Sequence, residues 1–140
     1  MAVILKQDFP IEAGSFGTAG EASATIKRTL KKLGVDTDVL RRVSVASYEV
    51  ELNIVIHSMG GTLSLLVEPE NITLISSDIG PGIPDIEKAM TEGYSTANEE
   101  ARTLGFGAGM GLPNMKRNAS TFSIESDPGK GTTIRMGFAL

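Results

Sequence analysis

The chain has 140 residues, of which 41% are hydrophobic and 21% are charged, and its formal net charge is −4. This length suits one domain, and the composition is typical of a folded globular protein rather than of a disordered chain. Binding to nucleic acid needs clustered excess Lys and Arg, which this acidic chain lacks. We therefore expect a single globular domain that has no nucleic-acid partner.

The scarcity of Cys and His excludes several kinds of site. Cysteine is absent and histidine occurs once, which excludes disulfides, cysteine nucleophiles and zinc sites built from thiolates or several histidines. No apolar run reaches the roughly 18 residues that a membrane-spanning helix needs, and charges come too early for a secretory leader. We expect a cytoplasmic protein with one domain over residues 1–140 and no membrane partner.

The first part of the chain predicts one strand followed by two helices. Residues 3–9 have the composition of a strand, and Pro10, which cannot donate to a ladder, is expected to end it. Apolar residues then recur at helical spacing from about 17 to 33, and Gly34 is expected to stop this helix. A second, longer helix is predicted over 36–58, with Asp or Thr at its start as the cap.

The rest of the chain predicts two hairpins separated by helical and irregular segments. The predicted elements are strands 62–67 and 71–76, a short helix 85–90, a polar loop 91–106, a helix 111–117, and strands 121–125 and 132–138. A sheet with its helices packed on one face is the two-layer arrangement that suits this order. The predicted fold is therefore an α/β (α+β) two-layer sandwich with a mixed, mostly antiparallel sheet.

Glu49 and Asn53 are four residues apart in the predicted second helix and so project from the same face. Their neighbours are mostly apolar, and burying an unpaired polar group there is costly unless a ligand satisfies it. An amide oxygen suits Mg²⁺, and a carboxylate one turn away can accept a proton. Alternatively, both side chains face solvent. His57, on the same stripe, is interpreted as a packed or edge histidine rather than a catalytic one.

Asp78 lies just after a predicted strand and begins a run in which Gly80 and Gly82 alternate with other residues. Glycine lets the backbone approach a flat ligand closely. A carboxylate beside such a slot is an acceptor that suits an exocyclic amine such as that of adenine. The alternative is that the run is simply a turn, since Asp, Gly and Pro are typical turn residues.

Four alternating glycines, Gly105, Gly107, Gly109 and Gly111, lead through Leu112 into a predicted helix. Successive backbone N–H groups at a helix N-terminus form a nest that binds anions, and a polyphosphate would occupy it. The spacing matches neither the Walker A loop nor the dinucleotide fingerprint. The alternative is a plain flexible loop.

Thr132 follows Gly131 at the entry to the last strand. Its hydroxyl can both donate and accept, and strand alternation puts Thr132 and Thr133 on opposite faces, so only one of them can point into a site. Taken alone, this feature indicates only a hairpin turn.

In this order the four clusters resemble the GHKL ATPase superfamily, which has the Bergerat nucleotide-binding fold, and the resemblance covers nearly the whole chain. Residues 49–53 match its N-box, 78–83 its first glycine box, 105–111 its second, and 131–132 its threonine motif. Within the superfamily the chain is most similar to the anti-sigma and stressosome switch serine/threonine kinases of bacterial partner-switching systems.

The resemblance implies an ATP-dependent serine/threonine protein kinase that uses Mg²⁺. It implies Glu49 as the general base, Asn53 as the Mg²⁺ ligand and Asp78 as the adenine acceptor. It also implies backbone contacts to the nucleotide from Gly80, Gly82, Gly105, Gly107, Gly109, Gly111 and Leu112, and an adenine-side hydroxyl from Thr132. Residues 91–111 would form an ATP lid, in which Arg102 is either a γ-phosphate contact or a solvated loop charge.

The resemblance also implies partners. The substrate would be a Ser or Thr of a STAS-domain anti-sigma antagonist, and a sigma factor, a PP2C-type phosphatase and a second copy of the chain are further candidates. Two alternatives remain open: an anti-sigma factor that sequesters a sigma factor, and a non-catalytic ATP-sensing interaction module. Retention of Glu49 favours catalysis, because a pure sensor needs the metal ligand more than a base.

Overall fold

The computed structural model describes residues 4–80, 90, 111–127 and 129–140. The elements of this part of the chain are β1 (Leu5–Ile11), α1 (Glu21–Lys32), α2 (Thr37–His57), β2 (Gly61–Val67), β3 (Asn71–Asp78), α5 (Gly111–Asn118), β4 (Thr121–Asp127) and β5 (Gly131–Ala139). The predicted short helix over 85–90 falls almost wholly outside the described residues, and the predicted loop 91–106 falls entirely outside them.

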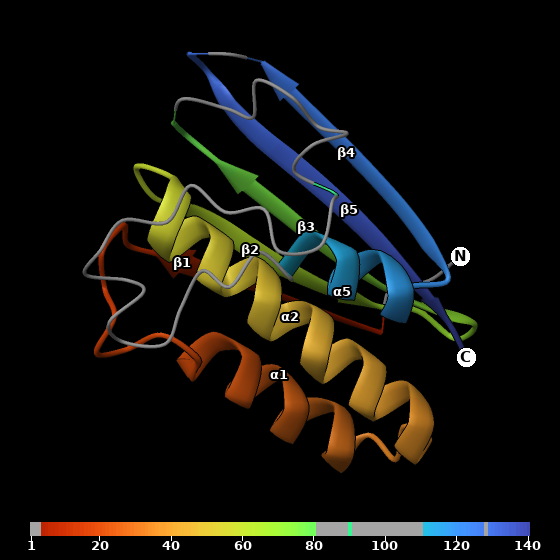
Figure 1. Cartoon of the computed structure of the whole chain (residues 1–140). Helices are drawn as coiled ribbons and strands as arrows, with labels where there is room; N and C mark the ends of the chain where they lie inside the picture. Colours follow the sequence, from red (N-terminus) through yellow and green to blue (C-terminus); the bar gives the residue numbers. More distant parts are fainter. Residues whose placement is uncertain (1–3, 81–89, 91–110, 128) are drawn as a thin grey trace.

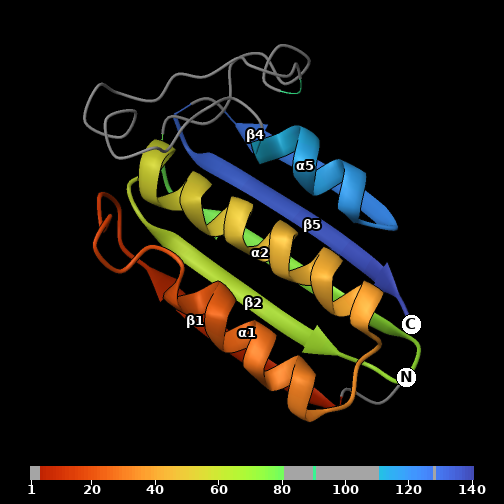
Figure 2. The same cartoon turned by 60° about the horizontal axis from the view of Figure 1, so that its bottom comes forward.

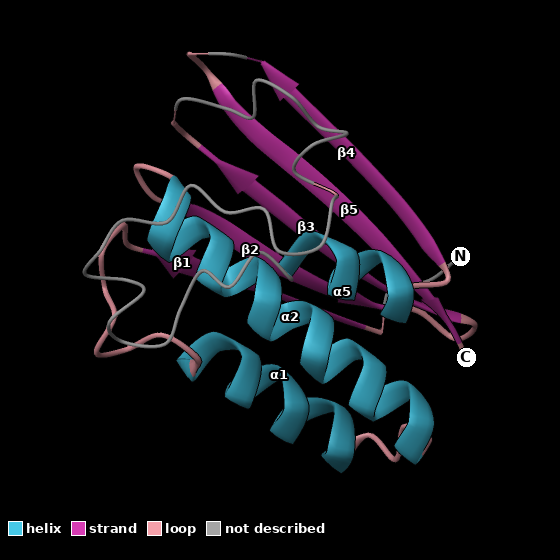
Figure 3. Cartoon of the chain, in the orientation of Figure 1, coloured by secondary structure: helices cyan, strands magenta, loops and turns pink. Residues whose placement is uncertain are grey.

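The five described strands form one sheet in the order β1-β2-β3-β5-β4, and each neighbouring pair is antiparallel. The three described helices all lie on the same face of this sheet, as Figures 1 and 2 show from two directions. In Figure 3 the helices form one layer and the strands the other. The predicted two-layer α/β sandwich is therefore confirmed, with both predicted hairpins in place.

Strand alternation explains where the core lies. Along each strand every second side chain points toward the helices, and those side chains on the three central strands are mostly apolar and buried. The helices contribute apolar residues at helical spacing to the same layer. Fully or almost fully buried residues of this core include Ile26, Leu30, Val43, Val50, Ile54, Leu63, Leu65, Leu74, Ile134, Met136 and Phe138.

The ends of the first two helices mostly follow local sequence signals. Gly34 follows α1 with φ +79°, a left-handed conformation that glycine adopts without strain. The Asp36 carboxylate accepts a hydrogen bond from the N–H of Asp38 at 3.1 Å and so caps α2. The start of α1 differs from the prediction, because the helix begins at Glu21 rather than near residue 17.

The prediction that Pro10 ends the first strand is wrong. Strand β1 continues to Ile11, and Pro10 is paired in register with Thr62 of β2. The strand lies at the edge of the sheet, where one row of N–H groups takes no part in the ladder. A residue without an N–H group is tolerated at such an edge, whereas a central strand would lose a hydrogen bond.

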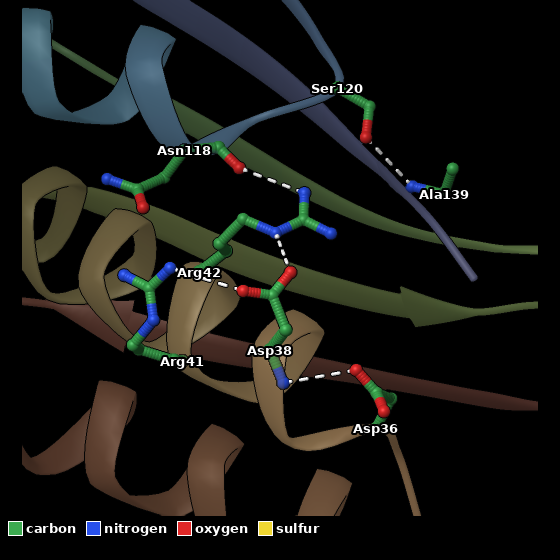
Figure 4. A network of polar contacts seen from close by, with 7 residues as sticks. All are labelled: Asp36, Asp38, Arg41, Arg42, Asn118, Ser120 and Ala139. Carbon is green, nitrogen blue, oxygen red and sulfur yellow. Dashed lines mark hydrogen bonds and ion pairs between the residues drawn. The ribbon is translucent and has the colours of Figure 1, made fainter.

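Arg42 of α2 connects the two helices that carry much of the site, as Figure 4 shows. Its Nη1 donates to the carbonyl oxygen of Asn118 at 3.4 Å, and its Nε donates to Asp38 at 3.0 Å. A cation at a helix C-terminus is favourable because the last carbonyl groups carry partial negative charge. Just beyond α5, the hydroxyl of Ser120 accepts from the N–H of Ala139 at 3.0 Å. These contacts hold α5 alongside α2 and next to the sheet.

Candidate functional site

Glu49 and Asn53 lie on the side of α2 that faces the first residue of α5. A Cβ placed on Gly111 would be 3.3 Å from Oε2 of Glu49 and 3.7 Å from Oδ1 of Asn53. Both side chains are half-buried. The absence of a side chain at Gly111 thus leaves space directly beside a carboxylate and an amide oxygen, and the N-terminus of a helix opens onto that space.

The surroundings of Glu49 change its proton affinity in two opposite ways. Burial raises the pKa of the Glu49 carboxyl above its ordinary value, and a hydrogen bond from the side chain of Asn114 partly offsets this. The Asn114 Oδ1 accepts from Nη1 of Arg117 at 2.9 Å, so its amide nitrogen is the group that donates to Glu49. A carboxylate with a raised pKa that is held by a neighbouring donor is suited to act as a base.

Asn114 was not among the residues predicted from the sequence. Its spacing offered a signal, because it lies three residues after Gly111 on the predicted helix and thus on the same side of α5. That face meets α2 only in the folded chain, so the spacing alone does not connect Asn114 with Glu49.

Asp78 ends the central strand β3 and points toward the helix layer. Its Oδ1 accepts a hydrogen bond from the N–H of Thr132 at 3.0 Å. Burial raises the pKa of the Asp78 carboxyl, and this hydrogen bond partly offsets the rise. The backbone N–H of Thr132 therefore holds one carboxylate oxygen in place while the carboxylate remains half-buried at the end of the strand.

Glycines on both neighbouring strands let the chain pass close to Asp78. A Cβ on Gly61 of β2 would lie 2.5 Å from the carbonyl oxygen of Ser77, which no real structure tolerates. A Cβ on Gly131 of β5 would overlap the carbonyl oxygen of Asp78 itself. Gly131 also has φ +148°, a conformation that other residues rarely adopt. The backbones of three strands thus lie unusually close together at Asp78.

The segment after Asp78 packs against the end of α2. The N–H of Met59 donates to the carbonyl oxygen of Ile79 at 2.7 Å, and a Cβ on Gly80 would lie 3.2 Å from Cα of Ser58. The N–H of Gly80 donates to the carbonyl oxygen of Lys130 at 3.2 Å. The residues just after α2 therefore pack against the residues that follow β3, and these in turn are hydrogen-bonded to the turn before β5.

Thr132 is the threonine that points inward, and its side chain is part of the buried layer at 7% exposure. Its Oγ1 lies 3.0 Å from Oγ of Ser126 on the edge strand β4. Thr133, the next residue, lies on the opposite face of the sheet, as strand alternation predicts.

Two further residues singled out from the sequence lie at the ends of helices. Leu112 is buried in the first turn of α5. His57 is the last residue of α2, and burial lowers the pKa of its imidazole, which favours the neutral form. Other predicted site residues lie outside the described part of the chain, namely Gly82, Arg102, Gly105, Gly107 and Gly109.

Glu51 is a second residue that sequence reasoning missed. It is 2% exposed, and its carboxylate accepts hydrogen bonds from the backbone N–H groups of Gly20 at 3.0 Å, Ala22 at 3.3 Å and Ser23 at 2.9 Å. These are the N–H groups that begin α1, which has no cap from its own N-cap side chain. The only signal for this role was a charged residue in a mostly apolar stretch of α2.

The described residues hold neither a cluster of metal-ligating side chains nor a helix that could span a membrane. They contain no group of three or more His, Cys, Asp or Glu side chains arranged to hold a metal ion. No helix in the same part of the chain is both long enough and apolar enough to cross a membrane.

Comparisons relate the chain to known proteins. The family model described as histidine kinase-, DNA gyrase B- and HSP90-like ATPase matches residues 38–140. The serine/threonine-protein kinase RsbT of Bacillus subtilis (strain 168) is 34% identical over 113 residues, which cover 78% of this chain and 79% of RsbT. The anti-sigma F factor of Thermoanaerobacter sp. (strain X514) is 36% identical over 99 residues, which cover 67% of this chain and 66% of that protein.

A solved structure supports the fold alone. The chain aligns with a chain of the SiaB-SiaC complex from Pseudomonas aeruginosa with a TM-score of 0.59 and 13% sequence identity, and the match covers 97% of this chain and 89% of the other.

Proposed function

The chain belongs to the histidine kinase-, DNA gyrase B- and HSP90-like ATPase family, and from this premise we propose that it is an ATP-dependent serine/threonine protein kinase. Family membership implies ATP as the nucleotide. The proposed substrate is a Ser or Thr hydroxyl on a STAS-domain anti-sigma antagonist of a bacterial partner-switching system. The similarity to the kinase RsbT supports this choice of reaction.

The observation that carries the proposal is the placement of Glu49 and Asn53 beside Gly111. A carboxylate with a raised pKa and an amide oxygen share one space, and a helix N-terminus opens onto it. Phosphoryl transfer needs mainly positioning and charge stabilisation from a protein. A base, a ligand for a hard cation and N–H groups for phosphate oxygens meet these needs.

We assign a separate role in the reaction to each of four residues. The Glu49 carboxylate takes the proton of the substrate hydroxyl, and Asn114 holds that carboxylate in position. Asn53 would hold Mg²⁺ through Oδ1, and Asp78 would accept a hydrogen bond from the amino group of adenine. When bound, ATP supplies the transferred phosphoryl group and Mg²⁺ neutralises charge on its phosphate oxygens.

The donor set fits magnesium held mainly by the nucleotide. Asn53 offers one hard oxygen ligand, and the described residues contain no metal cluster of three acidic or histidine side chains. Mg²⁺ usually keeps several waters and binds phosphate oxygens, with one or two protein ligands, at nucleotide sites.

The proposal is tested with labelled ATP, Mg²⁺ and the STAS-domain protein encoded nearest to this chain. We expect transfer of label to a Ser or Thr of that protein. Glu49→Gln should abolish the transfer while leaving ATP affinity nearly unchanged, and Asp78→Asn should weaken ATP binding. Glu125→Gln, at an exposed position of β4, is the matched control. The absence of any heat or melting shift with millimolar ATP and Mg²⁺ would refute the proposal, as would full transfer by Glu49→Gln.

A second candidate is an anti-sigma factor of the same fold, which the similarity to anti-sigma F factors favours. In that case sequestering a sigma factor is the output and phosphorylation of the antagonist resets it. Retention of a sigma subunit by the purified protein, released when the antagonist is added, would support this candidate. Transfer of label without any bound sigma subunit would support the switch kinase, whose released partner could be a PP2C-type phosphatase.

A further inference from the structure

Ser76 places a hydroxyl in a row of the sheet that is otherwise apolar. It lies on β3 two residues before Asp78, so its side chain points toward the helices on the same face as Asp78. The residues directly opposite it in register are Leu63 on β2 and Ile134 on β5. Both are buried, and Ser76 itself is only 1% exposed. The hydroxyl of Ser76 is therefore flanked within the sheet by hydrocarbon side chains.

The Ser76 hydroxyl has no hydrogen-bond partner among the residues that the structure describes. In the same part of the chain, every side-chain polar atom that is completely enclosed does have a partner. The small accessible part of Ser76 is therefore its hydroxyl. Because burying a polar group without a partner is costly, such a group points to a ligand that satisfies it.

The hydroxyl is accessible from the end of the sheet that carries Asp78. In the other direction along β3 the next inward-facing residue is Leu74, which is fully buried, as is Leu63 beside Ser76. Toward the strand end the next inward-facing residue is Asp78, which is half-buried, and its partner in register is Gly61, which has no side chain. The space that reaches the Ser76 hydroxyl thus lies on the side of the proposed adenine acceptor.

The spacing of Ser76 and Asp78 suits one amino group between them. Alternate residues of a strand are about 6.6–6.8 Å apart along it. Two acceptors that bind the two hydrogens of an amino group at about 2.9 Å are about 5 Å from each other. The Asp78 side chain is longer than that of Ser76, and its rotation accommodates the remaining difference.

We propose that Ser76 is a second adenine-binding residue, whose hydroxyl oxygen accepts one hydrogen of the adenine amino group while Asp78 accepts the other. The inference rests on the proposed function, because it requires adenine beside Asp78. The proton of the Ser76 hydroxyl remains for a water molecule. A purine without the amino group offers this oxygen no donor, so Ser76 contributes to the selection of adenine.

The test compares the affinities of Ser76→Ala for ATP and for purine riboside triphosphate, in which a hydrogen replaces the amino group, by calorimetry. A hydrogen bond of ordinary strength corresponds to about fivefold in affinity. We expect the variant to bind ATP about fivefold more weakly than the unmodified protein does and to bind purine riboside triphosphate equally well. Ser77→Ala, at the next position on the opposite, exposed face of β3, is the matched control and should change neither affinity. An unchanged ATP affinity, or an equal loss for both nucleotides, would overturn the inference.

A melting temperature separates a ligand contact from a structural one. Ser76→Ala removes an unpartnered hydroxyl from the nucleotide-free protein, so it should melt no lower than Ser77→Ala, which makes the same change in the same strand. If Ser76→Ala melts clearly lower, the hydroxyl stabilises the fold itself and the inference is wrong.

The inference and the proposed function can fail separately. If Asp78→Asn weakens ATP binding but Ser76→Ala does not, the role of Ser76 is wrong and the nucleotide site stands. If the unmodified protein does not bind ATP, the proposed function fails, and the inference fails with it.

Discussion

The carboxylate of Glu51 accepts a hydrogen bond from the backbone N–H of Ser23 at 2.9 Å, so a side chain of α2 caps a helix that lies 28 residues earlier in the chain. The same carboxylate accepts from Gly20 and Ala22. Negative charge is favourable at a helix N-terminus, where N–H groups have no partner within the helix. Glu51 therefore fixes α1 to the helix that carries Glu49 and Asn53.

Replacing Glu51 tests this role through stability. Glu51→Ala leaves two buried N–H groups and one part-buried N–H group without an acceptor, and we expect the free energy of unfolding to fall by about 2–4 kcal/mol. Glu51→Gln keeps one acceptor oxygen and should lose less. Urea denaturation followed by far-UV circular dichroism measures both. Glu125→Ala, at an exposed position of β4, is the control, and an equally small effect of Glu51→Ala would disprove the capping role.

Glu49 should make the nucleotide-free protein less stable at neutral pH. Its pKa is raised in the folded state, so the folded chain binds this proton more tightly than the unfolded chain does. The stability that Glu49 contributes is present below its ordinary pKa of 4.5 and is lost as pH rises through the folded pKa.

Glutamine does not ionise, so Glu49→Gln does not lose this stability as pH rises. We expect the variant to be more stable than the unmodified protein by about 1 kcal/mol at pH 8, the usual size of a stabilising substitution. At pH 4 the two proteins should differ little. Thermal melts across this pH range measure the difference. A stability gap that is constant with pH, or that widens toward acid, would contradict a raised pKa.

Asn114 should control the pH dependence of the proposed reaction. Its hydrogen bond lowers the pKa of Glu49, so Asn114→Ala should raise that pKa further. The base must be deprotonated to act, and the acidic limb of the rate profile should therefore move to higher pH. Lys116→Ala, at an exposed position of α5, is the control. An acidic limb that stays in place would show that Asn114 does not act on Glu49.

Gly111 should be required for the space beside Glu49. Gly111→Ala places a methyl group 3.3 Å from the carboxylate oxygen, closer than most real contacts, so the carboxylate must shift. A displacement of about 1 Å of a catalytic group costs up to about a hundredfold in rate, and we expect the smaller shift needed here to slow phosphoryl transfer by up to about tenfold. Gly17→Ala is the matched control, because a Cβ there meets nothing within 4 Å. Equal rates for the two variants would contradict the assignment.

Features set by neighbouring residues could be predicted from the sequence, and features set by distant contacts could not. Gly34 and Asp36 follow local rules for helix ends, and both are confirmed. The continuation of β1 through Pro10 depends on the strand lying at the edge of the sheet, which only the assembled topology decides. Glu51 was missed because its partners lie 28 to 31 residues away.

The candidate site shows the same division. The helical spacing of Glu49 and Asn53 predicted their shared face, and the position of Asp78 after a strand predicted a carboxylate at a strand end. The sequence offered only turn chemistry for Gly131, whereas its conformation and the closeness of Asp78 require glycine there. The contact between Asn114 and Glu49 depends on how α5 packs against α2, which no local pattern describes.

The crowding of three backbones around Asp78 has a mechanical consequence. Asp78 ends strand β3 between β2 and β5, and the amides along these central strands are expected to exchange with solvent only when the whole domain unfolds. Glu49 and Asn53 belong instead to the helical layer. One wall of the site is thus rigid, and adjustments between free and occupied forms fall on the helices.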